Sequence, residues 1–567
     1  MPRSFFLLVV LAALSFFSGL GRGAITDSDE AFYAEAAREM VESGDWLTPH
    51  YNYEPRFQKP ALYYWLAAAT YLVTGPNEMA ARFWSACAGL GLVLVVAACG
   101  RRWCSDESGL LAGAITATNF GYFALARMAL PDLPVTFFIT LAIYAALVAA
   151  LDRERHPRRW LLISAAAAAL GFLTKGPIAI AIPALVVLPI VLIERRSMNL
   201  RAADLALAAL LFSAIALPWY GAMWTRHGTA YVAEFFIGDN FERFATTRFN
   251  DPRPWWFYLP VLLGGLLPWT PLALVWFTPI KQFLLRQRDV GIVDLRLLLW
   301  VLLPLTFYTA SVGKQPRYVL PVLPPVALLL ASAIIERTRD WRTLDGGRFR
   351  PRPSPSASLG CALAGLVLVA LSLLIYRAQI LFPDVANSVT PGAAAIIAAM
   401  GVLTIIVSLT NLRVAPACVA VAAAITFAVL PYAVLASPTD AAVRHLAAMV
   451  TAARDGPYAI GTYHVFVRNL VFYTGQRQID LINDDQLAEF VRQNERALVV
   501  LPQDDLERLR KERSLGLEAL GNVRYFDDAA VRVGTLLQPN ADEDIKTVVL
   551  ARPVRSTPAG TPTSFRD

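Results

Sequence analysis

Acidic and basic side chains stand beside long apolar runs in four short polar stretches of the sequence. These stretches are Thr26-Asp27-Ser28-Asp29-Glu30-Ala31-Phe32-Tyr33, Leu130-Pro131-Asp132, Thr174-Lys175-Gly176-Pro177 and Gly313-Lys314-Gln315-Pro316-Arg317-Tyr318. Cations in such a set can hold a phosphate and stabilise it as it leaves, while a carboxylate can orient or deprotonate an acceptor. The pattern therefore indicates transfer of a group from a donor that is a lipid phosphate.

Lysine is used sparingly, since the 51 basic residues comprise six Lys and 45 Arg. Three of the six, Lys59, Lys175 and Lys314, stand one or two residues before a proline in predicted turns. A compact ammonium meets a phosphate or a carboxylate differently from a guanidinium fork, so we interpret these three as functional. The alternative is that each lysine only extends its charge from a helix end into water.

The carboxylates of the first stretch also have a structural interpretation. Asp27 or Asp29 could cap a helix that begins near Glu30, because Asp is favourable at an N-cap and Glu in the first turn. We favour capping for Asp27. Asp29 and Asp132 are acids beside apolar spans and near lysines, which favours a functional role for both.

Composition places the chain among polytopic α-helical membrane proteins. Of its 567 residues 56% are hydrophobic and 17% charged, and the mean hydropathy is +0.47, whereas soluble domains are nearer a quarter charged. The net charge of +7 does not indicate nucleic acid, because Arg also accumulates in the cytoplasmic loops of membrane proteins. The five Cys form no CxxC pair and no His pair has a ligand spacing, so neither a disulfide nor a metal site is predicted.

Apolar runs predict about 13 transmembrane helices, since about 20 apolar residues cross a bilayer. The runs are 4–20, 79–99, 108–128, 133–151, 160–174, 177–193, 203–222, 255–279, 295–312, 318–335, 358–376, 392–411 and 414–436. The fifth and sixth nearly touch, which predicts a tight turn at one membrane face. The first run could instead be a cleaved signal peptide. Arg-rich alternate loops place the N-terminus in the cytoplasm and, with 13 spans, the C-terminus outside.

The polar regions lie mainly on the outer side. The membrane domain, 1–436, has outer loops at 21–78 and 223–254, and the first of these has helical patterns around 30–43 and 60–74. The second helical pattern is apolar and aromatic, which is typical of a helix in the membrane interface.

The C-terminal region turns polar and is predicted to form a small outer α/β domain over 437–550. The apolar run 497–501 lies between charged helical patterns at 484–496 and 504–513. A tail at 551–567 and an inner stretch at 348–357 are predicted to be disordered from their Pro and Ser content.

The first outer loop resembles that of the bacterial lipid A 4-amino-4-deoxy-L-arabinose transferases, which are GT-C glycosyltransferases distantly related to the protein O-mannosyltransferases. The likeness covers most of the first 340 residues. It rests on Asp29-Glu30-x-x-Tyr33-Ala34-Glu35, Met40-Val41-Glu42-Ser43-Gly44-Asp45-Trp46, Thr48-Pro49-His50, Arg56-Phe57-Gln58-Lys59-Pro60, Arg127-Met128, Asp132, Thr174-Lys175-Gly176-Pro177, Phe257-Tyr258-Leu259-Pro260, Lys314, Tyr318 and Leu320-Pro321.

The resemblance implies a GT-C fold and roles for individual residues. Asp29 and Asp132 would be the catalytic acids, and Lys59 would contact the donor phosphate. Lys314 and Tyr318 would line the donor cavity. Lys175 and Arg317 are further cations predicted to bind the donor phosphate. The remaining candidates for the active site are Asp27, Glu30, Tyr33, Arg56 and Gln58.

Gln58 departs from the family, which commonly has Glu at this position. The second outer loop also has no His after His227. A divalent metal held by that Glu and a loop His is therefore doubtful here, and no cofactor is predicted. Gln58 also leaves the sugar open, because a cationic amino-sugar would lose a possible partner.

The sequence thus predicts a multi-pass glycosyltransferase of the bacterial inner membrane with its C-terminal domain in the periplasm. It would transfer a sugar, most simply 4-amino-4-deoxy-L-arabinose, from undecaprenyl phosphate to lipid A, with inversion. A protein O-glycosyltransferase, or a transferase for another envelope glycan, would keep the chemistry and change the acceptor. A transporter would place its charges near the bilayer midplane, whereas here they stand at span ends.

Overall fold

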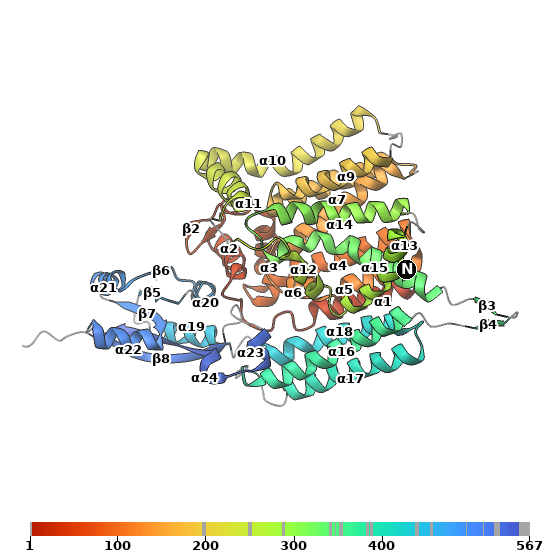
Figure 1. Ribbon diagram of the computed structural model, residues 1–567. Coiled ribbons are helices and arrows are strands. Elements are labelled where there is room, and N and C mark those ends of the chain that lie inside the picture. Colours follow the sequence, from red (N-terminus) through yellow and green to blue (C-terminus); the bar gives the residue numbers. More distant parts are fainter. Residues whose placement is uncertain are drawn as a thin grey trace, which may run out of the picture.

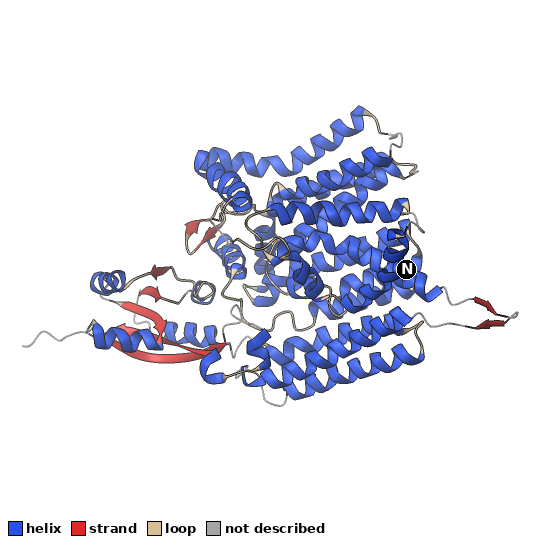
Figure 2. Ribbon diagram, viewed as in Figure 1, coloured by secondary structure: helices blue, strands red, loops and turns tan. Residues whose placement is uncertain are grey.

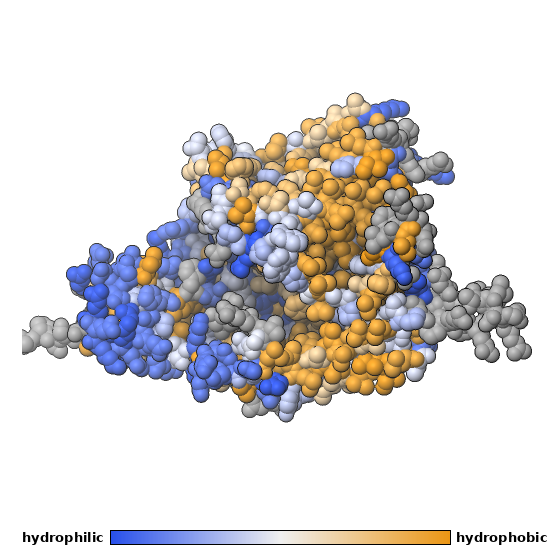
Figure 3. All heavy atoms as spheres, viewed as in Figure 1, coloured by the Kyte–Doolittle hydropathy of each residue, from blue (hydrophilic) through white to orange (hydrophobic). Residues whose placement is uncertain are grey.

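The computed structural model is a bundle of helices that lie side by side, with a small sheet domain at one end (Figures 1 and 2). Apolar side chains cover the flank of the bundle, whereas the sheet domain is hydrophilic (Figure 3). The chain is a multi-pass membrane protein. The structure describes residues 3–152, 154–194, 200–247, 252–285, 290–339, 343–345, 348–350, 355–381, 385, 389–436, 441–453, 458–465, 467–494, 496–513, 515–526 and 533–554.

Each of the 13 predicted apolar runs falls on a helix or on consecutive helices. Among the described residues, eight helices are long and apolar enough to cross a membrane, or ten if two bent pairs each count as one span. The helices that carry the 13 runs are, in chain order, α1 (Arg3–Phe17), α4 (Glu78–Trp103), α5 (Asp106–Ala117) with α6 (Phe120–Ala126), α7 (Asp132–Leu151), α8 (Pro157–Lys175), α9 (Ile178–Glu194), α10 (Ala202–Val232), α12 (Tyr258–Gly265) with η2 (Thr270–Trp276) and α13 (Phe277–Leu284), α14 (Ile292–Ala310), η3 (Pro316–Val322) with α15 (Leu323–Arg339), α16 (Pro355–Ala378), α17 (Val389–Thr410) and α18 (Ala415–Val434).

The predicted tight turn between the fifth and sixth spans is present. Helix α8 ends at Lys175 and α9 begins at Ile178, and Gly176 between them has a φ of 81°. A Cβ atom on Gly176 would lie 2.6 Å from the Phe235 ring, so both the backbone and the packing require glycine. The turn thereby fixes Lys175 at the helix end and seats a segment from the second predicted outer loop.

The first outer loop contains the two expected helices, α2 (Asp29–Ser43) and α3 (Leu62–Thr74). Ser28 caps α2 by accepting a hydrogen bond from the Glu30 backbone N–H, so Asp29 is the first helical residue. On α3, Tyr63 and Tyr64 are buried while Val73 is exposed. Between the helices a two-strand hairpin, β1 (His50–Tyr51) and β2 (Glu54–Pro55), turns at Asn52 and Tyr53, both with positive φ.

The second outer loop is more helical than the sequence indicated. Helix α10 continues past residue 222 to Val232, and a π-helix, η1 (Ala233–Glu242), and the single turn α11 (Arg243–Ala245) follow. Gly228, with a φ of 58°, bends the chain within this stretch. The predicted outer loop 223–254 thus contains helical segments, in which Phe235 and Tyr231 pack in an apolar cluster with residues of α8 and α10.

The sheet domain has five strands in the order β6-β5-β7-β9-β8. Strand β5 (Ala459–Tyr463) pairs in parallel with β6 (Gln478–Leu481) and β7 (Ala497–Pro502), and β9 (Ile545–Pro553) pairs antiparallel with β7 and β8 (Leu517–Phe526). The surrounding helices are α19 (Ala442–Ala452), α20 (Leu470–Thr474), α21 (Asp484–Gln493), α22 (Gln503–Glu512), α23 (Val533–Leu537) and α24 (Ala541–Asp544). The strand at 497–501 and the helices predicted around 484–496 and 504–513 are present.

Two stretches expected to be disordered contain regular structure. Strand β9 extends to Pro553, where it pairs with Leu517, so the first residues of the expected tail 551–567 belong to the sheet. The inner stretch 348–357 overlaps β4 (Arg348–Arg350), which pairs with β3 (Thr343–Asp345), and the start of α16. Residues 351–354 and 555–567 lie outside the described residues.

The sheet domain packs on the first outer loop. The Tyr53 hydroxyl donates to the Gly475 carbonyl at 2.7 Å, and Asn52 exchanges two hydrogen bonds with the backbone of Gln478. Arg444 forms an ion pair with Glu78 at 2.8 Å. These contacts hold the domain against the loop that carries α2.

Candidate active site

A cavity of about 530 Å³ lies where α2, the α8–α9 turn, η1 and η3 meet the end of α7. Its polar part is lined by Asp29, Tyr33, Arg56, Gln58, Lys59, Asp132, Lys175, Asp239, Asn240, Arg243, Ser311, Arg317 and Tyr318. Its apolar part is lined by residues of α7, α9, α14 and η1, among them Val135, Ile139, Ile178, Ala181, Phe236, Phe241 and Phe307. The cavity thus joins a charged chamber to an apolar wall between spans.

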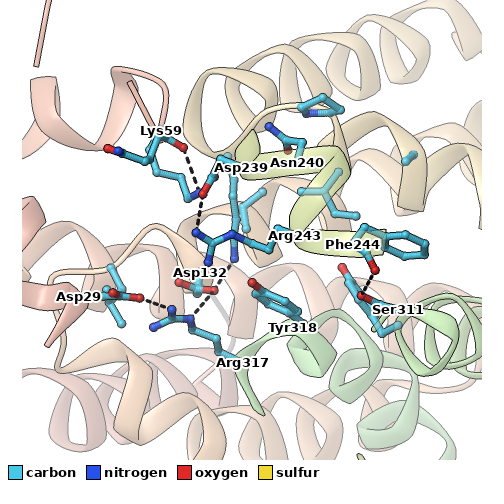
Figure 4. A pocket seen from close by; sticks show the side chains of 18 of the residues that line it. Asp29, Lys59, Asp132, Asp239, Asn240, Arg243, Phe244, Ser311, Arg317 and Tyr318 are labelled. Atoms are coloured by element: carbon cyan, nitrogen blue, oxygen red, sulfur yellow. Dashed lines mark hydrogen bonds and ion pairs between the residues drawn. The ribbon is translucent and has the colours of Figure 1, made fainter. Parts of the chain in front are cut away.

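Asp132, the first residue of α7, holds two cations at the base of the chamber. Its Oδ1 lies 2.5 Å from Lys175 Nζ and 3.6 Å from Arg317 Nε. Arg317 also forms an ion pair with Asp29, so one guanidinium joins the two carboxylates (Figure 4). The Asp132 side chain is 4% exposed and that of Asp29 38% exposed. Asp132 is therefore enclosed by its cations, while Asp29 faces the open side.

Asp239 of η1 forms a second group of ion pairs on the other side of the chamber (Figure 4). Its carboxylate contacts Lys59 Nζ through Oδ2 and accepts a hydrogen bond of 2.5 Å from Arg243 through Oδ1. Gln58, next to Lys59, donates to Glu234 at the start of η1. Loop one and η1 are therefore joined across the cavity by charged and polar contacts.

The chamber carries an excess of positive charge. Its lining contains five cations and three carboxylates, a net charge of +2. Burial would raise the pKa of Asp29, but Arg317, Arg56 and Arg243 outweigh it and hold that pKa below its usual range. A chamber of this charge is suited to a small anion, and Asp29 stays ionised within it.

Aromatic rings support the cations. The Arg56 guanidinium lies 4.2 Å from the centre of the Phe32 ring, and Lys175 Nζ lies 5.0 Å from that of Tyr318. Tyr33 stacks on Tyr64 at 5.4 Å. Such contacts fix long flexible side chains, so the cations are preorganised around the cavity.

The structure brings together nine of the twelve site residues predicted from the sequence. Those that line the cavity are Asp29, Tyr33, Arg56, Gln58, Lys59, Asp132, Lys175, Arg317 and Tyr318. Three predicted residues, Asp27, Glu30 and Lys314, are not among its lining residues.

Each of the three has another role. Asp27 accepts a hydrogen bond from the backbone N–H of Arg468 in the sheet domain, and Ser28 rather than Asp27 caps α2. Glu30 is fully buried and pairs with Arg82 at 2.8 Å, which also binds backbone carbonyls of the chain after α1. Lys314 folds back to donate to the Ser311 carbonyl at 2.5 Å, because the short turn before η3 directs it there.

The sequence reasoning missed Asp239, Asn240 and Arg243. All three stand in the second outer loop, whose run Asp239-Asn240-Phe241-Glu242-Arg243 places charges and aromatic residues between two spans. The available signal was that this loop lies on the same membrane side as Asp29 and Asp132. Among the described residues no group of three or more His, Cys, Asp or Glu is placed to hold a metal ion.

The fold is that of a GT-C glycosyltransferase. The structure matches ArnT from Cupriavidus metallidurans bound to undecaprenyl phosphate with a TM-score of 0.70 at 21% identity, over 98% of this chain and 99% of that one. Residues 5–227 match the family model of the dolichyl-phosphate-mannose-protein mannosyltransferases.

Two curated relatives define the family. The undecaprenyl phosphate-alpha-4-amino-4-deoxy-L-arabinose arabinosyl transferase of Pseudomonas aeruginosa (strain UCBPP-PA14) is 35% identical over 65% of this chain, and the match spans 65% of that protein's length. The transferase of the same name from Pseudomonas savastanoi pv. phaseolicola is 33% identical, over 65% of this chain and 68% of the relative. The chain belongs to the family of these aminoarabinose transferases.

Proposed function

We propose that this protein transfers 4-amino-4-deoxy-L-arabinose from undecaprenyl phosphate to lipid A at the periplasmic face of the bacterial inner membrane. The observation that carries the proposal is a chamber of net charge +2 that opens onto an apolar wall between spans. Membership in the aminoarabinose transferase family supports the sugar and the lipid carrier. The Arg-rich alternate loops support a cytoplasmic N-terminus and, with it, a chamber on the periplasmic side.

The donor would divide between the two parts of the cavity. Its phosphate would lie among Lys59, Lys175, Arg243 and Arg317, which line the chamber. Its polyprenyl carbons would lie along the apolar residues of α7 and α9, where burial of hydrocarbon is favourable. The arrangement selects a lipid-borne phosphate and presents the sugar toward Asp29.

The transfer would exchange one bond at the anomeric carbon of the sugar. An oxygen of the acceptor attacks this carbon from the face opposite the phosphate, and the bond between the carbon and the phosphate oxygen breaks. The bonding electrons leave with the phosphate, which becomes a monoester with a charge of about −2. The chamber's charge of +2 complements that product better than the singly charged donor, so it favours charge separation.

The carboxylates of Asp29 and Asp132 would have different tasks. Asp29 is the more exposed and stays ionised, so it can orient the acceptor, take its proton or stabilise positive charge on the sugar. Asp132 is enclosed by Lys175 and Arg317 and would position these cations for the phosphate. Asp29 is thus the catalytic residue of this mechanism and Asp132 a positioning residue.

A hydroxyl acceptor, as in protein O-glycosylation, is the second candidate, because the matching family model is named for protein mannosyltransferases. A lipid A phosphate is already ionised, whereas a hydroxyl must lose a proton and needs a base. We expect Asp29→Asn to reduce transfer far more with a hydroxyl acceptor than with a phosphate. Equal losses on the two acceptor types would remove this distinction.

Mass spectrometry of lipid A tests the proposal. The host lacks its own aminoarabinose transferase, makes the lipid-linked sugar and expresses either this chain or Asp29→Asn. We expect a pentosamine-sized mass gain with the native chain and its loss with the variant. Asp152→Asn is a matched control, because Asp152 lies at the other end of α7.

Absence of the mass gain from native protein that is folded and inserted would reject this donor and acceptor. The same membranes would then be assayed for sugar on envelope proteins, which is the result the hydroxyl candidate requires. A mass gain that persists in Asp29→Asn would instead retain the substrates and reject the role given to Asp29.

A further inference from the structure

Asp239 occupies the place where the proposed function puts a phosphate. Its two oxygens bind Lys59 and Arg243 separately, as two oxygens of a phosphate would. The side chain is 2% exposed, so its carboxylate is shielded from water. A donor phosphate and the Asp239 carboxylate therefore compete for the same two cations.

The other two carboxylates of the chamber are placed differently. Asp29 and Asp132 share Arg317, and Asp132 also holds Lys175, so these acids organise the side of the chamber near α2 and α7. Asp239 comes from a π-helix, a rare form of helix that is found frequently at functional sites. Of the three acids, Asp239 is the one whose ion pairs in the chamber leave out Arg317.

We propose that Asp239 is a displaceable counter-ion of the donor-phosphate site. In each turnover it would release Lys59 and Arg243 to the phosphate when the donor binds and pair with them again after transfer. The proposal rests on the proposed function. Before a phosphate binds, Asp239 compensates two enclosed cations, which would otherwise be strongly unfavourable. After transfer, Asp239 competes for the same cations and promotes release of the polyprenyl phosphate.

Charge supports this role. With Asp239 the chamber has a net charge of +2, which matches a phosphate monoester, and without it the charge would be +3. A chamber of +3 would retain the product more tightly. Asp239 would therefore lower the affinity for the phosphate and raise the rate of product release.

Binding of farnesyl phosphate to the purified full-length protein in detergent tests the proposal. Farnesol is the reference ligand, because it has the isoprenoid chain without the phosphate. We expect Asp239→Asn to bind farnesyl phosphate about tenfold more tightly than the native protein, and in turnover to lower both kcat and the donor KM. Asp239→Glu keeps the charge and should restore native values, whereas a purely structural role would not give this pattern.

Two further variants serve as controls. Asp106→Asn removes an exposed acid at the start of α5 that does not line the cavity, and it should leave farnesyl phosphate binding unchanged. The double variant Asp239→Asn with Arg243→Gln returns the net charge to +2 and should return the affinity toward the native value. This double variant also tests the charge argument if Asp239→Asn alone folds poorly.

The outcomes separate this proposal from the proposed function. Equal or weaker farnesyl phosphate binding by folded Asp239→Asn would overturn the role of Asp239 and leave the transferase in place. Native protein that binds farnesyl phosphate no better than farnesol would overturn the phosphate site itself. A structure of the native protein with undecaprenyl phosphate gives a direct test, because Lys59 and Arg243 should then contact the phosphate rather than Asp239.

Discussion

The two ends of helix α7 carry ion-pair clusters of opposite character. The mouth cluster lies at the cavity and comprises Asp29, Asp132, Lys175 and Arg317. The opposite cluster lies beyond Leu151 and comprises Arg102, Asp152, Glu154, Glu194 and Arg296. Both use the same kinds of side chain at similar distances, yet none of the five residues of the opposite cluster lines the cavity.

The difference lies in the balance of charge and in the space available. The opposite cluster has two cations and three carboxylates, and Arg296 is 5% exposed with its guanidinium bound to Glu194 and near Asp152. The mouth cluster has two cations and two carboxylates, and it lines a cavity of about 530 Å³ whose whole lining has five cations and three carboxylates. A buried ion-pair cluster is therefore a candidate binding site where cations exceed acids beside a cavity, and a structural clamp where they do not.

Asp29→Asn should have the largest effect on activity. Loss of an ionised carboxylate beside the reacting sugar should lower kcat by about 10²–10⁴-fold with a hydroxyl acceptor, for which Asp29 acts as a base. With the lipid A phosphate of the proposed function, which is already ionised, only the orienting and charge-stabilising roles of Asp29 are lost, so the fall in kcat should be smaller. Single-turnover transfer with purified protein and a lipid-linked donor measures this loss. Asp152→Asn changes the same functional group in the opposite cluster and should leave kcat unchanged, and a comparable loss there would remove the distinction between the two ends.

Lys59→Gln should have the next largest effect. The variant removes a charge from the proposed phosphate site, so the donor KM should rise by about 10²-fold while the fold is retained. Lys59→Arg should recover only part of the affinity, because a guanidinium differs in shape from an ammonium. Titration with lipid-linked donor at fixed acceptor measures the change.

Arg102→Gln is the matched control for Lys59, since Arg102 pairs with Asp152 at 2.5 Å in the opposite cluster. It should leave the donor KM unchanged. A rise in donor KM for this control as large as that for Lys59→Gln would show that loss of any ion-paired cation weakens donor binding indirectly.

The fold and much of the mouth cluster could be predicted from sequence because their signals are local. A span needs only a run of about 20 apolar residues, and the alternation of Arg-rich loops assigns each polar stretch to a side. Asp29, Asp132, Lys175 and Arg317 were thereby placed at one face. Their separation in sequence, from residue 29 to residue 317, did not matter once the side was known.

Rotation around a helix and long-range packing could not be predicted in the same way. Asp29 and Glu30 are neighbours, yet one lines the cavity and the other is buried against Arg82, because successive residues of a helix point about 100° apart. Asp239 and Arg243 reach the cavity because Phe235 packs on Gly176, a contact between distant segments. Lys314 turns away because of the local backbone path before η3.

Glu194→Gln should affect stability rather than activity. The variant weakens the pairing of an enclosed guanidinium, which should lower the free energy of unfolding by the order of 3 kcal/mol, and Asp152 near Arg296 limits the loss. Thermal unfolding in detergent should show a lower midpoint, while kcat per folded molecule is retained. A fall in kcat without a fall in the midpoint would contradict the assignment of the opposite cluster as a clamp.

Glu39→Gln should have the smallest effect, and it contrasts two acids of α2. Burial and the neighbouring Glu35 raise the pKa of Glu39 from 4.5 to about 8, whereas the pKa of Asp29 is held below its usual range. A carboxyl whose pKa is raised on folding contributes stability that is complete below about 4.5 and is lost as the pH rises to about 8. The Asp29 contribution is already complete above its usual pKa of 3.8 and stays constant over this window.

The native unfolding midpoint should therefore fall between pH 5 and 8, and Glu39→Gln should flatten this fall because Gln is neutral throughout. Both Glu39 oxygens accept from the Tyr53 backbone N–H at 3.0–3.1 Å, and the Gln oxygen can keep that bond. Thermal unfolding at several pH values measures the slope. A native slope that persists in Glu39→Gln would assign the pH dependence to other groups. Glu39 would then contribute no more than Asp29 to the pH dependence of stability in this window.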